Sequence, residues 1–377
     1  MNKNIKVYLT CTGVGIINRG IETFARECFD GLHGTEGLQI ELFKGAGAEK
    51  PDEHRLWNLP RNGKLAPLLG NAIDRNGYVV EQLSSFLPFV DRIRKGKPDI
   101  IFYSDSNLGF QLHQWRKQIG VPYRLLFSNG GPCHPPFNRT DFVQQVAPFY
   151  REQALAAGEA SSRHFLVPYG INVLDEHTLL PEEDRRQIRQ QLGLPLDRPI
   201  VISVGWISAT HKRMDYVVEE IAALPEPRPY LVMLGHMDAN SPAIIDLATH
   251  KLGKDGFIAR SVPYEQVANY YRSADVFVLG SLKEGFGRVY LEAMIHGLPC
   301  IVNDHPVMRY VLAEQGIFTD LSKPGAMSTA LADLLQRNQN LESKIGRMEY
   351  VRQKFGWRNI APDYLQMFYD CLTPVKQ

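Results

Sequence analysis

The chain has 377 residues, with 42 lysines and arginines against 41 aspartates and glutamates, and no block of like charge. This balance argues against a nucleic-acid partner, and the length exceeds what one hydrophobic core usually supports, so we expect two domains. The five cysteines lie far apart without a CxxC pair, which argues against a disulfide framework or zinc cluster and favours a reducing cytoplasm. No stretch approaches the ~20 apolar residues that span a bilayer, although peripheral attachment at the inner membrane face stays open.

Short apolar, β-branched runs alternate with helix-like segments along the chain. Such alternation indicates βαβ units and parallel sheets covered on both faces. We therefore predict an α/β fold with two Rossmann-like, doubly wound parallel sheets. The runs are IKVYLTC, LQIELF, PDIIFYS, YRLLFS and HFLVPYG in the first half, and PIVISVG, YLVMLG, DVFVLGS and PCIVN in the second.

The boundary between the two predicted domains falls after VPYGIN, residues 167–172. This Pro- and Gly-containing turn leads to PEEDRRQIRQQLGL, whose spacing of apolar and charged residues predicts a solvated amphipathic helix. We accordingly place the first domain at residues 1–172 and the second at residues 173–355.

The segment from residue 274 to residue 303 carries the strongest chemical signal. The strand ADVFVLGS runs into the loop LKEGFG, then a predicted helix of about ten residues from Arg288 that stops near Gly297, then the strand PCIVN. The loop thus follows the carboxyl end of a parallel strand, where open α/β sheets bind ligands. Gly285 and Gly287 would let a phosphate or sugar approach the backbone and the N–H groups of the helix start.

Two glutamates bracket this loop. Glu292 falls in the second helical turn among Val289, Leu291, Ala293 and Met294, so we expect a buried carboxylate that must be paired. A vicinal diol such as a ribose would satisfy it. For two glutamates alone the simpler interpretation is favoured, in which Glu292 complements the helix dipole and Glu284 is a solvent-facing loop acid.

The order of several motifs resembles the retaining glycosyltransferases of the GT-B fold, especially glycosyltransferase family 4. EGFGRVYLEAMIHGLPCIV is similar to the family's Glu-x7-Glu segment, and VPYGIN to its domain-crossing turn. VISVGWISATHKRMDYVVEEIAAL, YYRSADVFVLGS and FGWRNIAPDYLQMFYD resemble further family segments in the second half, whereas the first half matches chiefly in TGVGIINRGIET. The resemblance implies two domains facing a central cleft, with an acceptor-binding first domain, a donor-binding second domain, and a C-terminal helix, residues 356–377, that returns to the first.

The resemblance also implies roles for particular residues. Glu284 would hold donor-sugar hydroxyls and Lys212 would neutralise the diphosphate, as the two catalytic residues. Glu292 would accept hydrogen bonds from the ribose. The remaining donor-binding positions implied are Gly13, Gly15 and Gly20 of the first domain's loop, Gly205, Arg213, Gly285, Phe286, Gly287 and Arg288 around the diphosphate and sugar, and Arg260 and Val262 near the base.

The chain departs from the family pattern at two places. Trp206 stands where members commonly carry an arginine that assists the lysine, so Arg213 or His211 would have to substitute, and the tryptophan could instead pack on a base or sugar. A strand-end histidine common in the family is also missing. The corresponding strand ends in Asn129, with His134 a few residues later, and these two are the candidates on the acceptor side.

The resulting functional prediction is a retaining hexosyltransferase that needs neither cofactor nor metal, since no Asp-x-Asp motif follows a strand. It would move sugar from a UDP- or GDP-sugar to a sugar, lipid-linked or other hydroxyl acceptor in polysaccharide or glycoconjugate synthesis. A sugar-nucleotide epimerase, a phosphorylase and a non-catalytic nucleotide-sugar binder stay as alternatives. An NAD-dependent dehydrogenase is more remote, because TGVGIIN has Asn18 where the third glycine belongs and an ambiguous acid, Glu36 or Glu41, afterwards.

Overall fold

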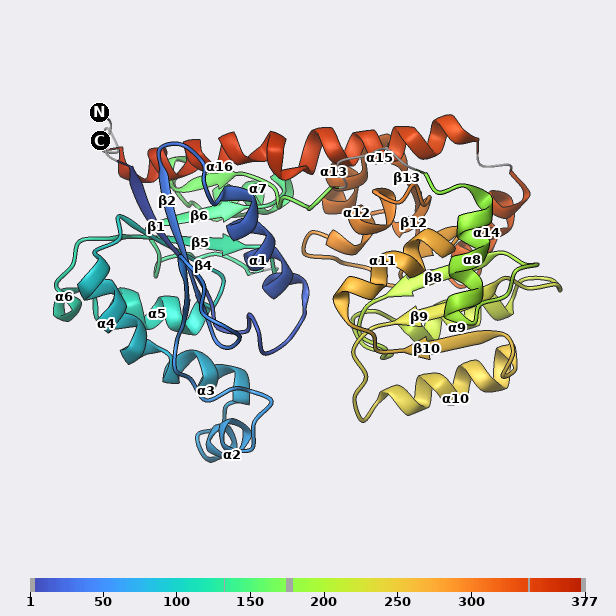
Figure 1. Cartoon of the computed structure of the whole chain (residues 1–377), viewed down its shortest axis with the longest axis horizontal. Helices are drawn as coiled ribbons and strands as arrows, with labels where there is room; N and C mark the ends of the chain where they lie inside the picture. Colours follow the sequence, from blue (N-terminus) through green and yellow to red (C-terminus); the bar gives the residue numbers. More distant parts are fainter. Residues whose placement is uncertain (1–3, 132, 174–178, 338–339, 374–377) are drawn as a thin grey trace. The chain divides into compact units, whose positions relative to one another are not determined.

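A computed structural model of the chain describes residues 4–131, 133–173, 179–337 and 340–373. The chain divides into two compact units (Figure 1). One unit comprises Met1–Asn172 together with Phe355–Gln377, and the other comprises Val173–Lys354.

The first unit is built on a seven-stranded parallel sheet with the order β3-β2-β1-β4-β5-β6-β7. Its strands are β1 (Ile5–Cys11), β2 (Leu38–Lys44), β3 (Glu53–Arg55), β4 (Ile100–Tyr103), β5 (Arg124–Asn129), β6 (Phe142–Gln145) and β7 (His164–Leu166). Its helices are α1 (Gly20–Leu32), α2 (Leu65–Ala72), α3 (Gly77–Ser84), α4 (Phe86–Gly96), α5 (Ser106–Gln114), α6 (Arg116–Ile119), α7 (Pro148–Ala156) and α16 (Trp357–Leu372).

Alternating side chains of the strands fill two core layers, one on each face of this sheet. Ile101 and Tyr103 pack in the cluster that includes α4 and α5. Phe102, between them, faces the other way and contacts Phe24 of α1 and Phe368 of α16, with ring centroids 6.4 and 5.7 Å apart. Burial on both faces explains why these strands read as continuous apolar runs rather than alternating ones.

The C-terminal helix α16 is fastened to the first unit by buried polar contacts as well as aromatic ones. The Tyr364 hydroxyl donates to the carbonyl of Pro168 at 3.0 Å and accepts from the Gln144 side chain at 2.9 Å. Trp357 lies 6.4 Å from Phe24, which in turn stacks on Tyr169 at 3.7 Å. These contacts make the last helix part of the first unit's core.

The second unit has a six-stranded parallel sheet with the order β10-β9-β8-β11-β12-β13. Its strands are β8 (Ile200–Val204), β9 (Tyr230–Leu234), β10 (Phe257–Arg260), β11 (Val276–Val278), β12 (Cys300–Asn303) and β13 (Gly316–Thr319). Its helices are α8 (Glu182–Leu192), α9 (Met214–Ala222), α10 (Ser241–Leu252), α11 (Tyr264–Ser273), α12 (Arg288–Met294), α13 (Pro306–Leu312), α14 (Ala326–Gln336) and α15 (Leu341–Phe355), the last of which ends at the boundary.

Each sheet has a topological switch point, where the strand order reverses. It lies between β1 and β4 in the first unit and between β8 and β11 in the second. Ligands of open α/β sheets bind outside the carboxyl ends of the strands at such points. The strand order therefore directs attention to the residues that follow β1, β4, β8 and β11.

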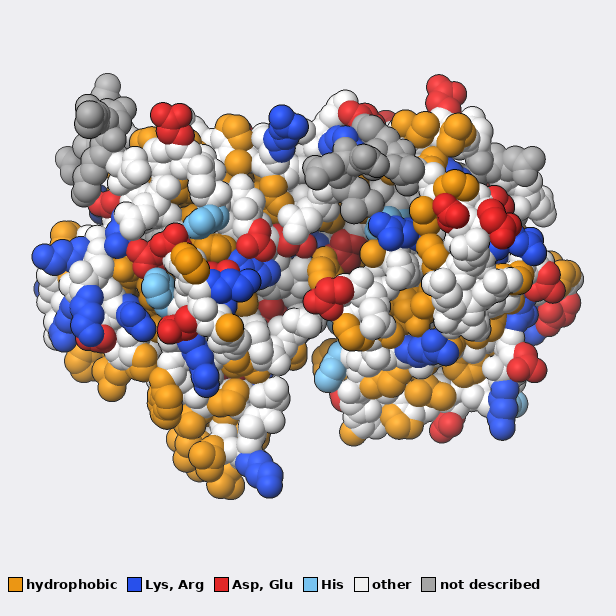
Figure 2. Space-filling view, in the orientation of Figure 1, with side chains coloured by type: hydrophobic (Ala, Val, Ile, Leu, Met, Phe, Trp, Pro, Cys, Tyr) orange, Lys and Arg blue, Asp and Glu red, His pale blue; other side chains and the backbone are white. Residues whose placement is uncertain are grey.

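The prediction of two Rossmann-like parallel sheets is confirmed, whereas four strands were not predicted. These are β3 and β6 in the first sheet and β10 and β13 in the second. The helix predicted to run about ten residues from Arg288 has seven, because α12 ends at Met294 and a turn leads to Gly297. In the first unit, hydrophobic side chains also gather on the surface over α2 (Figure 2).

Candidate functional site

An ion pair occupies the switch point of the second unit. Lys212 lies in the loop after β8, and Glu284 lies in the loop after β11. The Lys212 Nζ is 2.7 Å from the Glu284 Oε1, and the two side chains are only 17% and 8% exposed. The structure therefore brings together the two residues predicted to be catalytic, at the edge of the sheet where ligands bind.

The loop after β8 presents Lys212 because two glycines allow a close backbone approach. A methyl group on Gly205 would lie 3.1 Å from three carbons of the Lys212 stem, which rests against this glycine. Gly235, after β9, has a φ of +151°, and a Cβ there would lie 1.7 Å from the carbonyl oxygen of Gly205. Side chains at these positions would displace the lysine or the strand ends.

The loop after β11 turns sharply into α12. Gly287 has a φ of +78°, in the left-handed region that favours glycine, and α12 begins at the next residue. Phe286 is buried at 3% exposure, Arg288 is buried at 6%, and Gly285 is half-buried. The turn is thus anchored by Phe286 and Arg288 while Gly285 keeps access to solvent.

The prediction that the Glu292 carboxylate is buried is wrong, and the burial of Glu284 was not predicted. Glu284 is buried rather than solvent-facing, whereas Glu292 is half-buried. The Tyr271 hydroxyl donates to Glu292 Oε2 at 3.3 Å, and burial followed by the charge of Glu292 raises the Tyr271 pKa well above its ordinary value. Glu292 is thus partly accessible to solvent and accepts a hydrogen bond from a tyrosine of α11.

Arg213 and His211 are the two predicted replacements for the cation that is missing at Trp206. Arg213 has a φ of +48°, and its guanidinium donates to the carbonyls of Gly280 and Leu321 at 3.1 and 2.8 Å. His211 is exposed, with its Nε2 3.8 Å from the Glu284 Oε1. Trp206 is 42% exposed. Arg213 thus links its loop to the segments that contain Gly280 and Leu321. His211 is the second basic side chain close to Glu284, beside Lys212.

Arg260 and Val262 lie at the end of β10, on the edge of the second sheet. The Arg260 guanidinium donates to the carbonyl of Leu192 and to the Tyr270 hydroxyl, each at 3.2 Å. Val262 is half-buried. The Arg260 side chain is therefore engaged within the protein, which leaves the backbone of this segment as the part able to meet a base.

The glycine loop of the first unit follows β1, and two of its glycines lie where there is no room for a side chain. A Cβ on Gly13 would lie 2.2 Å from the Glu22 Oε1, and a Cβ on Gly15, whose φ is +82°, would lie 2.3 Å from the Ala46 carbonyl. Gly20 is exposed at the start of α1 with open space around it. The loop conformation thus requires Gly13 and Gly15 but not Gly20.

A buried network of charged residues beneath this loop was not predicted. Arg61 donates through its Nε and Nη2 to the two carboxylate oxygens of Glu81, and Arg19 does the same to Glu22. The Arg61 Nη1 is 3.6 Å from Glu22. The Arg61 side chain is 9% exposed, and Glu81 and Glu22 are buried. Four residues from three segments of the chain therefore neutralise one another.

The network continues into the switch point of the first sheet. Asp105, one residue before α5, accepts from the Thr12 backbone N–H at 2.6 Å and from the Tyr78 hydroxyl at 2.8 Å. Burial raises the Asp105 pKa above its usual range. Asp105 follows the predicted strand PDIIFYS, so its position at a strand end was visible in the sequence, whereas the pairing of Arg61 with Glu81 had no local signal.

The two residues proposed for the acceptor side differ in exposure. Asn129 is buried at the end of β5, where its side chain donates to Gln145 at 2.8 Å and to the Cys133 carbonyl at 3.2 Å, and accepts from the Cys133 N–H. His134 is exposed on the loop that Asn129 braces. Asn129 thus shapes the loop, and His134 is the side chain that faces solvent.

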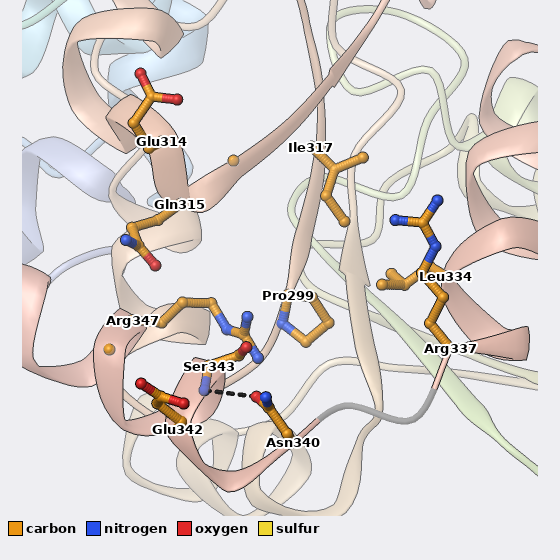
Figure 3. A pocket seen from close by; sticks show the side chains of 12 residues that line it. Pro299, Glu314, Gln315, Ile317, Leu334, Arg337, Asn340, Glu342, Ser343 and Arg347 are labelled. Atoms are coloured by element: carbon orange, nitrogen blue, oxygen red, sulfur yellow. Dashed lines mark hydrogen bonds between the residues drawn. The ribbon is translucent and has the colours of Figure 1, made fainter.

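A pocket of about 560 Å³ lies elsewhere in the second unit (Figure 3). It is lined by Pro299 and Gly316, at the amino ends of β12 and β13, and by Arg347 of α15. The Arg347 guanidinium donates to the Gly297 carbonyl at 2.9 Å, and burial lowers its pKa. The pocket is thus at the sheet edge opposite to Lys212 and Glu284. Among the described residues, no cluster of three or more His, Cys, Asp or Glu is placed to hold a metal ion.

Comparison with known families matches the segment of the chain that carries this site. The model of the family described as glycosyl transferases group 1 matches residues 184–351, which span the loops bearing Lys212, Glu284 and Glu292. The matched segment makes up less than half of the chain. The GT-B fold expected from the sequence is confirmed by the two parallel sheets and by the solved structures described below.

Two curated relatives are each 29% identical to the chain. One is a D-inositol 3-phosphate glycosyltransferase of Xylanimonas cellulosilytica, over 56% of this chain and 52% of the relative. The other is a mannosylfructose-phosphate synthase of Agrobacterium fabrum, over 54% of this chain and 46% of the relative. The chain therefore matches about half the length of these relatives.

Solved structures extend the similarity to nearly the whole chain. Sucrose-phosphate synthase from Thermosynechococcus elongatus superposes with a TM-score of 0.74 at 21% identity, covering 98% of this chain and 99% of that one. Anabaena HepE in complex with UDP and glucose gives a TM-score of 0.72 at 14% identity, over 97% and 99%. At these identities the likeness shows the fold. No helix among the described residues is long and apolar enough to cross a membrane.

Proposed function

We propose that the chain transfers a sugar from a nucleoside-diphosphate sugar, with UDP- and GDP-sugars as the donors to screen, to an acceptor hydroxyl with retention of anomeric configuration. The observation that carries this proposal is the largely buried contact of Lys212 with Glu284 at the switch point of the second sheet. A cation and a carboxylate there match the two needs of a sugar diphosphate, which are charge neutralisation at the phosphates and hydrogen-bond acceptors for the sugar hydroxyls.

In the proposed reaction the bond between the anomeric carbon and the diphosphate oxygen breaks, and a bond to the acceptor oxygen forms on the same face. Negative charge grows on the leaving oxygen, and Lys212 stabilises it in a site whose low exposure strengthens the interaction. The acceptor proton passes to the leaving phosphate oxygen. Glu284 accepts from donor-sugar hydroxyls, and it keeps Lys212 in place while the site is empty.

The nucleoside end of the donor would be held by Glu292. Its carboxylate already accepts from Tyr271, which fixes the side chain, and its half-buried position leaves capacity to accept from a ribose hydroxyl. The similarity to the HepE structure, which is a complex with UDP and glucose, supports a uridine nucleotide as the first donor to test. Sugars, polyols and lipid-linked sugars are the acceptor classes to be screened.

The first experiment is a calorimetric titration of the purified protein with UDP, GDP, ADP and NAD in the presence of a chelator. We expect one nucleoside diphosphate to bind tightly and Glu292→Ala to weaken it by at least about tenfold, because a charge-assisted hydrogen bond is lost. Glu265→Ala, which removes an exposed glutamate of α11, is the matched control. Binding of NAD alone would contradict the assignment of the donor site. Equal affinity of Glu292→Ala and Glu265→Ala for the nucleoside diphosphate would contradict it as well.

Transfer is then tested with the donor class identified by titration. We expect turnover in chelator and a product whose anomeric configuration matches that of the donor, as read from NMR coupling constants. A strict requirement for magnesium would contradict the proposed role of Lys212, and a product of inverted configuration would refute retention. Tight donor binding without hydrolysis or transfer to any acceptor would instead indicate a nucleotide-sugar sensor.

A further inference from the structure

The helix α2 of the first unit exposes its large apolar residues and buries its small ones, the reverse of an ordinary amphipathic helix in a soluble protein. Its buried residues are the small ones, Ala66 and Gly70, whereas Leu65, Leu68 and Leu69 are 58%, 66% and 45% exposed. Ile73, directly after the helix, is 54% exposed. A surface helix of a globular protein normally places its large apolar residues toward the core. The exposed side chains of Leu65, Leu68, Leu69 and Ile73 are called the α2 apolar face below.

The packing beneath α2 explains why the small residues face inward. A Cβ on Gly70 would lie 2.5 Å from the Arg75 carbonyl oxygen, and a Cβ on Gly77 would lie 3.3 Å from the Pro67 nitrogen. The helix therefore sits backbone to backbone on the segment that leads into α3, with no room for a leucine between them. This orientation is built into the fold, so the α2 apolar face cannot turn inward without displacing that segment.

The α2 apolar face is concentrated rather than scattered. Figure 2 shows hydrophobic side chains gathered at the end of the first unit that α2 forms in Figure 1. Single exposed leucines are ordinary, but contiguous exposed apolar side chains on one short helix mark an interaction surface.

The charges around the α2 apolar face indicate the kind of partner. Lys64 precedes the helix and Arg75 follows it, both are exposed, and neither pairs with an acid among the residues the structure describes. Asp74 is the single acid between residues 62 and 76. Apolar side chains flanked by exposed basic ones suit an anionic lipid surface, which offers hydrocarbon and phosphate together. A second copy of this face would instead bring like charges together.

We propose that the α2 apolar face, with Lys64 and Arg75 at its ends, docks on anionic lipid bilayers. The leucines would enter the boundary between headgroups and acyl chains, and the two basic residues would meet lipid phosphates. The inference concerns a different surface from the donor site and does not depend on the proposed transfer.

The test is flotation of the full chain with vesicles of phosphatidylcholine alone or with added phosphatidylglycerol, in the absence of any nucleotide. We expect the protein to float with the anionic vesicles, and Leu68→Ser/Leu69→Ser to lower the bound fraction at least about tenfold. Lys64→Glu/Arg75→Glu should lower it about fivefold or more. The matched controls are Leu341→Ser/Ile345→Ser, which removes two exposed apolar residues of α15, and Arg186→Glu/Lys254→Glu, and both should float like the unaltered chain.

A second readout does not depend on loss of binding. The fluorescence of a Leu68→Trp variant should shift to the blue with anionic vesicles, whereas that of Leu341→Trp should not. Absence of flotation by the unaltered chain would overturn the proposal, as would equal flotation by the Leu68→Ser/Leu69→Ser variant. If that double variant converted a dimer to a monomer in light scattering and no form floated, the face would be a contact between copies instead. Equal melting temperatures among the variants show that folding is intact.

Discussion

The two switch points of this molecule have the same arrangement of strands, but they hold their charged side chains in different ways. In the first unit, Asp105 after β4 is bonded to the Thr12 backbone and to Tyr78, and beneath it Arg61 and Glu81 form a bidentate pair. In the second unit, Lys212 contacts Glu284, and the His211 Nε2 lies 3.8 Å from the same carboxylate oxygen. Charge at the edge of a sheet therefore has two different uses. They can be separated by how the cation is held, since Arg61 is held by a bidentate pair and Lys212 by a single contact among the described residues.

A group with several directional partners is held in place, and removing it disrupts its neighbours. A group with one partner can exchange that partner for a ligand at little cost, because one contact is replaced by another. The comparison predicts that substitutions in the first network lower stability, whereas substitutions in the second pair lower ligand binding and turnover. Four experiments test this difference.

The largest effect is expected for Lys212→Ala. Loss of the cation should lower kcat/KM about 100- to 1,000-fold, because a preorganised charge at the leaving group is removed. We expect little change in melting temperature, because the His211 ring stays near the Glu284 carboxylate. Lys283→Ala, which removes an exposed lysine beside Glu284 in the same loop, is the matched control and should keep near-normal turnover. If Lys212→Ala kept its rate within tenfold, the pair would be a structural one and the comparison would fail.

The next largest effect is expected for Arg61→Ala, this time on stability. The substitution leaves Glu81, which is fully buried, without its bidentate partner, and we expect a loss of about 3 kcal/mol in the free energy of unfolding by urea denaturation. Arg309→Ala removes a bidentate pair with Asp304 that lies on the surface, and it should leave the denaturation midpoint unchanged. Equal free energies of unfolding for the two variants would show that the first network does not stabilise the fold.

The sequence predicted the sheets well where apolar runs are continuous. The exceptions have physical causes. The strand β6 contains Gln144 and Gln145, whose buried side chains are satisfied by Tyr364 and Asn129, contacts that join segments far apart in the chain. The strands β3, β10 and β13 are short edge strands in which few residues need to be apolar.

The candidate site was predictable only in part. Lys212 and Glu284 follow strands that the sequence placed, so the order of the sheet brings them together. The half-buried position of Glu292 depends on how α12 packs against Tyr271 of α11, and the local sequence pattern does not encode this contact. The partners of Arg213 are backbone carbonyls, which leave no signature in the sequence.

A third test concerns His296, which stacks on Tyr271, the partner of Glu292, at 5.8 Å. Burial, followed by the charge of Arg272, lowers the His296 pKa to about 4. The unfolded chain binds this proton below about pH 6.5 and the native chain does not, so stability falls as pH decreases from 6.5 toward 4. The contribution amounts to about 2 kcal/mol between pH 7 and pH 5.

The His296→Phe variant isolates this contribution. Its free energy of unfolding should fall about 2 kcal/mol less than that of the unaltered chain between pH 7 and pH 5, as measured by urea denaturation at both values. His250→Phe, which replaces an exposed histidine of α10, is the control. Parallel pH profiles for the unaltered chain and His296→Phe would contradict this prediction. They would mean that His296 binds its proton in the folded state as readily as in the unfolded state.

The smallest effect is expected at Trp206, where the family commonly has an arginine. Trp206 is 42% exposed and lies 6.1 Å from His236, so its replacement should cost little stability. A second cation after β8 would assist Lys212 with the diphosphate, but its exposure to solvent screens the gain, and we expect Trp206→Arg to tighten nucleoside diphosphate binding only about two- to fivefold at low salt. Trp206→Gln has similar polarity without the charge and should not tighten it. If Trp206→Gln bound the nucleoside diphosphate as tightly as Trp206→Arg, removal of the indole would be the cause of the tighter binding. Lys212 would then be sufficient to neutralise the diphosphate.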